Sequence, residues 1–303
     1  MPTLSPLHIA TAAYDFAQAS SWSTYTERLS QWLDAACDQG AQLLVLPEYA
    51  SMEMASLGGS AVSTDLQASL HCVADWADQR RAWFAEQAEH RGCWIASGSG
   101  PVRHNVGFVN QAELHAPDGQ CLIQQKRIMT RFERETWGVQ AGQGLQVMQT
   151  PYGAMGLLLC YDSEFPLLAR RLVELGAQWL LVPSCTDTLA GAHRVRIACQ
   201  ARALENQCVV VRACTVGTAD WCAAVDENHG SAGIHAPPDT GWPDDGVVAE
   251  GEPDQTGWVT ASVCPEAIEA VREKGAVLNY AHWEEQEYTQ RLGASDTIKK
   301  SPH

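Results

Sequence analysis

Positive charge and long apolar runs are both scarce in this sequence of 303 residues. Lysine and arginine total 20 against 36 aspartates and glutamates, which leaves a formal net charge of −16. Nucleic-acid binding needs a basic surface, and an anionic membrane repels an acidic one, so we expect neither partner. The longest apolar runs, at 43–46 and 156–160, are far shorter than the ~20 residues of a membrane span.

Paired cysteine motifs are absent as well. No C-x-x-C pair occurs among the 11 cysteines, so we expect no zinc ribbon, thioredoxin-type site or other metal site. Their number is odd, and residues 1–10 show no basic flank before an apolar stretch, so we expect neither a disulfide framework nor a signal peptide. These features indicate a reduced, cytoplasmic protein in which most cysteines serve as small apolar side chains. No phosphate-binding or dinucleotide fingerprint is present, so no cofactor is expected.

What the chain does have is an alternation of apolar and helical segments. The expected buried strands are residues 43–46, 93–98, 155–160, 179–182, 208–214 and 258–263. The expected helices and hairpin are about 70–91, 166–175 and 193–206, with antiparallel arms at 108–115 and 121–126. This order favours an α/β fold with mixed sheets. We expect one domain over 1–295 and a flexible tail over 296–303.

Three polar residues, Glu48, Lys126 and Cys160, follow or end predicted strands, where α/β enzymes place their chemistry. Taken singly, each has an ordinary explanation as a loop carboxylate, a surface charge or a core thiol. Together they make a chemical set, because a thiol with a pKa of about 8.5 needs a cation or a base to become a nucleophile. A buried glutamate can take the thiol proton, and the backbone N–H of Tyr161 is a candidate oxyanion donor.

The segments around these residues resemble the motifs of the nitrilase superfamily, the carbon–nitrogen hydrolases. The similar segments are Leu-Pro-Glu at 46–48, Gln-Lys-Arg at 125–127, Leu-Leu-Leu-Cys-Tyr-Asp-Ser-Glu-Phe-Pro at 157–166 and Gln-Ala-Arg-Ala-Leu-Glu-Asn at 200–206. The resemblance covers about residues 7 to 265. It implies a four-layer α-β-β-α sandwich with two mixed β-sheets, which usually forms a homodimer or higher homo-oligomer through helices flanking the cysteine.

The resemblance also implies roles for the three residues. Glu48 would be the general base and then acid, Lys126 the oxyanion stabiliser, and Cys160 the nucleophile that forms a thioester. Many members carry a further glutamate that positions the substrate. Counting from Lys126 favours Glu133, whereas the family's Phe-x-x-Glu pattern favours Glu135, which we prefer.

The residues after the nucleophile bear on the substrate. Tyr161 and Asp162 resemble the amidase members, since nitrile-cleaving members usually have tryptophan directly after the cysteine. Carbamoyl amino-acid hydrolases often carry arginines where this chain has Ser163 and Glu164. The Glu164 carboxylate would repel a carboxylate and attract an amine, unless it caps the next helix or faces solvent. Thr186 follows another strand and is either a substrate-positioning residue or an ordinary loop residue.

The expected function is therefore thiol-dependent hydrolysis of a non-peptide C–N bond in a small amide, with release of ammonia or an amine. Three alternatives stay open: an acyltransferase that passes the same acyl group to an amine or thiol, a nitrile hydrolase, and a non-catalytic binding protein on the same scaffold. The sequence specifies neither the amide nor the oligomer size.

Overall fold

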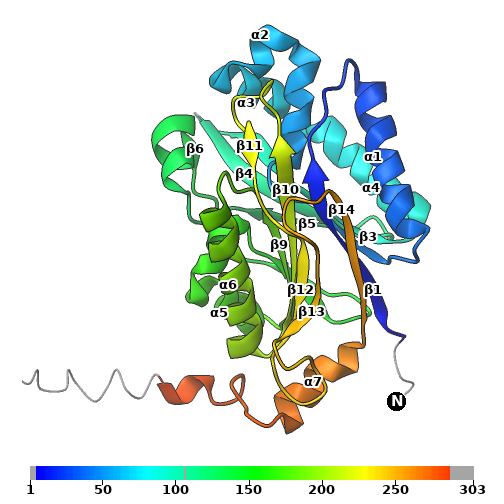
Figure 1. The fold of residues 1–303 in the computed structure, drawn as a ribbon, viewed down its shortest axis with the longest axis vertical. Coiled ribbons are helices and arrows are strands. Elements are labelled where there is room, and N and C mark those ends of the chain that lie inside the picture. Colours follow the sequence, from blue (N-terminus) through cyan, green and yellow to red (C-terminus); the bar gives the residue numbers. More distant parts are fainter. Residues whose placement is uncertain (1–4, 106, 287–303) are drawn as a thin grey trace, which may run out of the picture.

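Strand β1 (Leu7–Asp15) joins two sheets in the computed structural model, which describes residues 5–105 and 107–286 (Figure 1). Residues 7–13 of β1 pair antiparallel with β14 (Gly257–Val263), and residues 9–11 pair in parallel with β2 (Leu43–Val45). Beyond the residues that pair with β2, residues 13–15 of β1 pair in parallel with β10 (Val209–Thr218). Hydrogen bonds through β1 therefore connect both sheets into one 14-stranded system.

The first sheet has the order β5-β4-β3-β2-β1-β14, and the second has the order β7-β8-β9-β10-β12-β13. The remaining strands of the first sheet are β3 (Trp94–His104), β4 (Gly107–His115), β5 (Cys121–Gln125) and the short β6 (Val139–Gln140) beside β4. Those of the second are β7 (Val147–Met148), β8 (Ala154–Leu157), β9 (Ala177–Ser184), β12 (Gly233–His235), β13 (Val247–Glu250) and β11 (Glu227–Asn228) beside β10. Both sheets mix parallel and antiparallel pairs.

Alternate residues of the central strands enter different cores, which shows the layering. Leu43 and Val45 of β2 and Leu181 of β9 share one buried cluster between the sheets. Leu44 packs in a second cluster outside the first sheet, and Leu180 in a third outside the second sheet. Strands buried on both faces need continuous apolar runs. The structure confirms the four-layer α-β-β-α sandwich with two mixed sheets.

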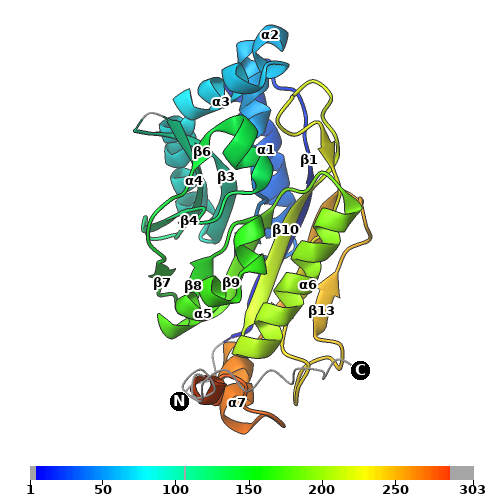
Figure 2. The ribbon, with the colours of Figure 1, turned by 90° about the vertical axis from the view of Figure 1, so that its left-hand side faces the viewer.

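Helices close the two outer layers (Figure 2). The outer face of the first sheet is covered by α1 (Trp22–Cys37), α3 (Leu66–Asp75) and α4 (Ala77–Arg91). That of the second is covered by α5 (Pro166–Glu174) and α6 (Leu189–Asn206). The other helical segments are η1 (Ala50–Gly58), α2 (Ser60–Ser63), η2 (Glu133–Trp137), η3 (Cys160–Glu164), α7 (Pro265–Lys274) and η4 (Trp283–Gln286). Within the described ranges, no helix combines the length and the apolar character that crossing a bilayer requires.

Several expected elements differ from the observed ones in their bounds, and two of these differences change the element itself. The helix expected over 70–91 is two helices, because the chain breaks at Trp76, whose ring stacks on Trp22 with centroids 5.4 Å apart. The strand expected over 155–160 ends at Leu157, so Cys160 starts a helical turn instead of ending a strand. The proposed tail over 296–303 and the end of the proposed domain lie outside the described residues.

The inner core provides a direct test of the layering. Replacing Ile9, which is 1% exposed on β1, by alanine should cost about 2 to 5 kcal/mol of unfolding free energy, because a cavity opens between the sheets. The matched change Ile123→Ala, at a side chain that is 36% exposed on β5, should cost no more than about 1 kcal/mol. Urea titration measures both values, and equal losses would contradict the placement of Ile9.

Candidate active site

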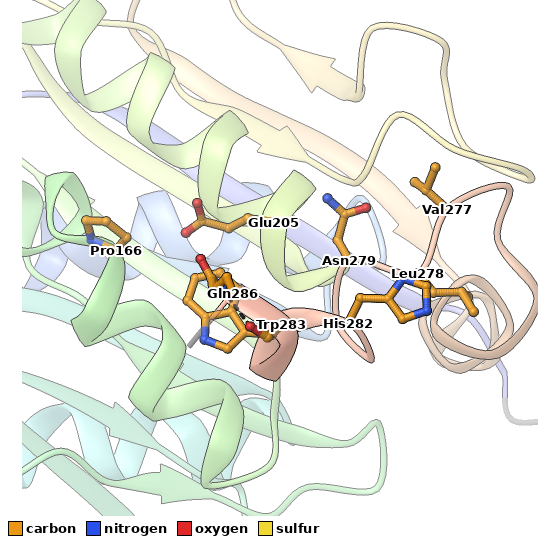
Figure 3. A pocket seen from close by; sticks show the side chains of 8 residues that line it. All are labelled: Pro166, Glu205, Val277, Leu278, Asn279, His282, Trp283 and Gln286. Atoms are coloured by element: carbon orange, nitrogen blue, oxygen red, sulfur yellow. Dashed lines mark hydrogen bonds between the residues drawn. The ribbon is translucent and has the colours of Figure 1, made fainter. Parts of the chain in front are cut away.

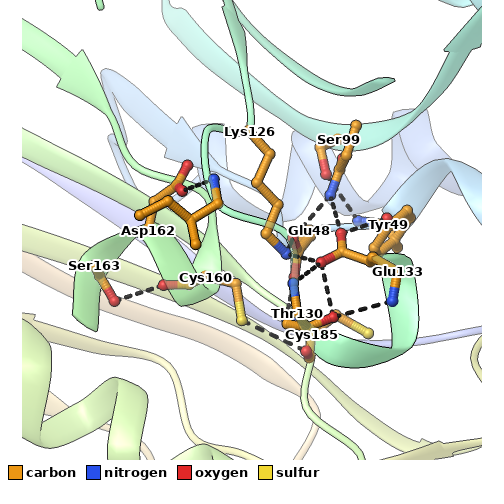
Figure 4. Close-up of polar contacts among 12 residues, drawn as sticks. Glu48, Tyr49, Ser99, Lys126, Thr130, Glu133, Cys160, Asp162, Ser163 and Cys185 are labelled. Atoms are coloured by element: carbon orange, nitrogen blue, oxygen red, sulfur yellow. Dashed lines mark hydrogen bonds and ion pairs between the residues drawn. The ribbon is translucent and has the colours of Figure 1, made fainter. Parts of the chain in front are cut away.

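Glu48, Lys126 and Cys160 converge beyond the ends of β2, β5 and β8 (Figure 4). The Lys126 Nζ lies 2.8 Å from Glu48 Oε1. The backbone of Cys185 connects the other two residues: its N–H donates to Glu48 Oε2 at 3.2 Å, and its carbonyl lies 3.6 Å from the Cys160 Sγ. All three side chains are almost completely buried. The structure thus brings together the three residues that the sequence singled out.

The chain around Glu48 is held by close backbone packing. Tyr49, directly after it, adopts a left-handed conformation with φ of 57°, and its N–H donates to Ser99 Oγ at 3.1 Å. Gly98 passes so near that an added Cβ would lie 2.2 Å from the Pro47 carbonyl oxygen. Gly98 also has φ of 74°, so only glycine fits there without strain. This contact places the Glu48 carboxylate at the end of the strand.

A second glutamate, Glu133, completes the network. Its Oε2 lies 2.7 Å from Lys126 Nζ and also accepts hydrogen bonds from the N–H and hydroxyl of Thr130, each at 2.9 Å. Its Oε1 accepts a hydrogen bond from the Tyr49 hydroxyl at 2.7 Å. The Asn110 Nδ2 donates both to Glu48 Oε1 at 2.9 Å and to Glu133 Oε1 at 3.3 Å. One ammonium and one amide therefore hold the two carboxylates together.

The structure places Glu133, and not the preferred Glu135, beside Lys126. Glu133 is 3% exposed and faces Lys126, whereas the Glu135 side chain is 55% exposed and pairs with Arg131 at 2.8 Å on the surface. The cause is local: residues 133–137 form a single wide π-type turn, in which the two glutamates point to different sides. Counting from Lys126 therefore identifies the glutamate that is buried beside it, and the role of either glutamate toward substrate stays a prediction.

Burial and neighbouring charges set the protonation of the four groups. Burial raises the pKa of Glu48 to about 7, although Lys126 opposes the rise. Burial alone would lower the pKa of Lys126, but Glu133 and Glu48 outweigh it and raise that pKa well above its usual value. Burial alone would raise the pKa of Glu133, but Lys126 together with the hydrogen bonds from Tyr49 and Thr130 outweighs it and lowers that pKa. Burial and the Glu48 charge raise the pKa of the Cys160 thiol. The site therefore holds a permanent cation, a permanent anion, and a thiol beside a carboxyl group that titrates near neutral pH.

Two further expected residues are engaged in local contacts. Glu164 pairs with Arg194 of α6 at 3.5 Å, and its expected attraction of an amine stays a prediction. It also does not cap α5, whose N-terminal cap makes no side-chain hydrogen bond. The Thr186 hydroxyl donates to the His229 carbonyl at 2.6 Å, which ties two loops together. Neither contact by itself assigns a role toward substrate.

Several residues of the network were not singled out from the sequence. Asn110 lies on the first arm of the predicted hairpin. A buried asparagine on a strand is the signal that could have found it. Tyr49 directly follows the Leu-Pro-Glu segment, so its position was visible although its bond to Glu133 was not. The backbone of Cys185 carries no side-chain signal at all, because its contribution is an N–H and a carbonyl.

A separate surface hollow of about 560 Å³ lies at the C-terminal end of the described chain (Figure 3). Glu205, His282 and Trp283 are among its lining residues, but Glu48, Lys126 and Cys160 are not. Within residues 5–105 and 107–286, no group of three or more His, Cys, Asp or Glu side chains could hold a metal ion. The buried network around Lys126 is the candidate active site, because it brings a thiol, two carboxyl groups and an ammonium together.

The family model described as Carbon-nitrogen hydrolase matches residues 10–273, a span that includes every residue of this network. The chain belongs to the carbon–nitrogen hydrolase family. A probable hydrolase of Bacillus subtilis, YhcX, is 30% identical over 273 residues, which cover 90% of this chain and 52% of that protein. The chain thus spans about half the length of this relative. A deaminated glutathione amidase of Synechocystis is 29% identical over 276 residues, covering 85% of this chain and 93% of the relative.

Solved structures share the fold of this carbon–nitrogen hydrolase family member. A carbon–nitrogen hydrolase from Helicobacter pylori G27 superposes with a TM-score of 0.76 at 16% identity, covering 96% of this chain and 99% of that chain. An amidase variant from Nesterenkonia sp. AN1, whose active-site cysteine carries the acetamide moiety of fluoroacetamide, superposes with a TM-score of 0.68 at 21% identity, covering 95% and 97%. At these identities the likeness is one of fold.

The two neighbouring glutamates offer a matched comparison. Glu133→Gln removes a carboxylate that is buried against Lys126 and should cost on the order of 3 kcal/mol of unfolding free energy. Glu135→Gln removes an exposed carboxylate of the same turn and should change the unfolding free energy by no more than about 0.5 kcal/mol. Chemical unfolding at pH 7 measures both, and the reverse ranking would restore Glu135 as the inward-facing residue.

Proposed function

We propose that this protein is a cysteine-dependent amidase that hydrolyses the C–N bond of a small, non-peptide amide. The observation that carries the proposal is the single buried network in which a thiol, a carboxyl group with a pKa of about 7 and a lysine ammonium meet. Nucleophile, base and charge stabiliser are the parts that acyl transfer needs. Relatives named deaminated glutathione amidase and omega-amidase support amides as the substrate class.

The proposed reaction starts with proton transfer from the Cys160 thiol to the Glu48 carboxylate. The thiolate attacks the amide carbonyl carbon, and the C=O π electrons move onto oxygen. The ammonium of Lys126 and the backbone N–H of Tyr161 bind this oxyanion, and such prearranged donors are commonly the largest single contribution to a rate enhancement. Burial strengthens the attraction, because the effective dielectric constant is lower than in water.

Collapse of the oxyanion breaks the C–N bond, and Glu48 returns its proton to the leaving nitrogen. Ammonia or an amine departs, and the acyl group remains on Cys160 as a thioester. Glu48 then takes a proton from water, whose oxygen attacks the thioester carbonyl. The C–S bond breaks with its electron pair on sulfur, and the acid product leaves. The proton on Glu48 returns to the Cys160 sulfur, so the cycle closes without a cofactor.

In this mechanism Glu133 keeps Lys126 protonated and in place. Its carboxylate is ionised, because the adjacent ammonium and the hydrogen bonds from Tyr49 and Thr130 lower its pKa, and it binds the Lys126 Nζ at 2.7 Å. Lys126 therefore stays a cation throughout turnover and does not compete with Glu48 as the base. We infer that Glu133 also lines the amide-binding position, as the resemblance implies for the further glutamate.

We also propose that the protein acts as a homodimer or higher homo-oligomer through α5 and α6. Leu167 on α5 is 75% exposed, and Ile197 on α6 is 62% exposed. Large exposed apolar side chains on adjacent helices are typical of association surfaces. These helices flank the turn that carries Cys160, so association would stabilise the surroundings of the nucleophile.

A screen of small amides, ureas and nitriles for ammonia release tests the proposed activity. Cys160→Ala should lower the rate at least 10³-fold, because it removes the nucleophile. Cys208→Ala, a change at another fully buried cysteine, should retain most of the activity if the protein stays folded. Ammonia release that persists in Cys160→Ala would refute the mechanism. A thioester that turns over only when an amine or thiol is added would indicate acyl transfer instead of hydrolysis.

The pH dependence follows from Glu48. Since burial raises the pKa of Glu48 to about 7, it is protonated and unable to act as base below that pH. We expect kcat/KM to rise about tenfold per pH unit below 7 and to level off above it. The pKa of Lys126 is raised well above its usual value, so no loss from its deprotonation is expected up to pH 9. A profile that is flat from pH 5 to 8 would exclude Glu48 as the base.

A further inference from the structure

Asp162 is a buried carboxylate to which the mechanism above gives no role. It lies in η3, two residues after Cys160, and is 1% exposed. Its Oδ1 accepts a hydrogen bond from the Ile128 N–H at 2.8 Å, and its Oδ2 accepts one from the Arg127 N–H at 3.0 Å (Figure 4). A carboxylate that accepts two backbone N–H groups makes charge-assisted hydrogen bonds, which are stronger than neutral ones.

These two bonds join the segments that carry two different functional groups. Arg127 and Ile128 are the residues directly after Lys126, whereas Asp162 belongs to the turn that begins at Cys160. The Arg127 guanidinium is directed to the Gly142 carbonyl, so Asp162 is bound by the backbone and not by this neighbouring cation. The contact therefore fixes the path of the main chain next to Lys126.

The turn at Cys160 needs such support. Cys160 has φ of 46°, a left-handed conformation that is costly for a residue with a Cβ. On one side the Ser163 hydroxyl donates to the Cys160 carbonyl at 2.6 Å, and Arg202 of α6 donates to the Ser163 carbonyl at 2.9 Å. Asp162 anchors the other side, toward Lys126. The strained turn is thus held from both directions.

We propose that Asp162 is a positioning residue that sets the separation between the Cys160 thiol and the Lys126 ammonium. The inference rests on the proposed function only in what that separation is used for, namely binding the thiolate and the oxyanion. Glu48 and Glu133 fix the Lys126 ammonium. If the bonds from Asp162 to the main chain at 127–128 are lost, the turn that carries Cys160 shifts, and the sulfur moves relative to the fixed cation. A misplacement of about 1 Å can cost 10²-fold in rate.

The groups around Asp162 are consistent with an ionised Asp162 carboxylate at neutral pH. Burial raises the pKa of Asp162 to about 6, while the bonds from the Arg127 and Ile128 N–H groups and the charge of Lys126 oppose the rise. The negative charge of Glu133 raises the pKa of Asp162 further. The carboxylate is therefore predominantly ionised at pH 7 and above, where both N–H bonds are made to a charged acceptor.

The test is the rate at which iodoacetamide alkylates Cys160, followed from pH 6 to 10 by mass spectrometry of the peptide that contains it. Asp162→Asn keeps the size of the side chain but loses the charge and one acceptor. We expect alkylation at pH 8 to slow at least tenfold and its pH midpoint to rise, because the ammonium stabilises the thiolate less. Asp162→Glu restores the charge and should recover part of the rate.

A matched control is Asp118→Asn, because Asp118 also accepts a backbone N–H, that of Gln120 at 3.1 Å, but lies in an exposed turn. It should leave rate and midpoint unchanged. A merely structural role would lower the melting temperature of Asp162→Asn without shifting the midpoint, and that result would overturn the proposal. If neither Asp162 variant folds, amide hydrogen exchange in the parent protein provides the test. Protection of the 127–128 amides should fall as Asp162 is protonated near pH 6. Protection that stays constant would overturn the proposal.

Amide turnover separates this inference from the proposed function. A parent protein that alkylates rapidly at Cys160 but cleaves no amide would refute the amidase proposal and leave the role of Asp162 testable by alkylation. If the parent cleaves an amide and Asp162→Asn equals it in kcat, alkylation rate and midpoint, the positioning role is refuted and the amidase proposal stands. The expected result is a kcat lowered at least tenfold with a KM within about threefold of the parent.

Discussion

The buried ammonium of Lys126 is the constraint on which the rest of the site depends. A charge removed from water must be paired, and Glu48 and Glu133 each bind the Lys126 Nζ within 3 Å. Each carboxylate is in turn bound by other donors, Asn110 among them. Losing one member leaves a buried charge short of partners. The proposed catalytic groups are therefore also a unit of the fold, and changes there are expected to affect stability as well as rate.

The two-sheet sandwich explains how residues so distant in sequence meet. β2 and β5 belong to the first sheet and β8 to the second, and Glu48, Lys126 and Cys160 follow these three strands. The candidate site therefore lies across the layers, with the Cys185 backbone, directly after β9, between Glu48 and Cys160. Apolar packing between the sheets sets the distance, and hydrogen bonds such as those of Asp162 refine it.

Much of this could be predicted from sequence, because continuous apolar runs mark strands buried on both faces, and Glu48, Lys126 and Cys160 sit at their ends. The rest depended on backbone conformations that spacing does not reveal. The wide turn over 133–137 decides which glutamate faces inward, and no residue count predicts a π-type turn. The left-handed φ of Cys160 shortened the expected strand. Asn110 and Asp162 act through contacts with segments distant in sequence, so the local sequence does not reveal their partners.

The central claim is that Cys160 carries the acyl group during turnover. Acid quenching of the protein while it cleaves an amide, followed by intact-mass measurement and peptide mapping, tests this claim most directly. The account predicts a mass increase equal to the acyl group of the substrate, confined to the peptide that contains Cys160 and removed by hydroxylamine. The claim would be contradicted by amine release with no mass increase, either at steady state or in a single-turnover burst. An adduct at another of the 11 cysteines would contradict it as well.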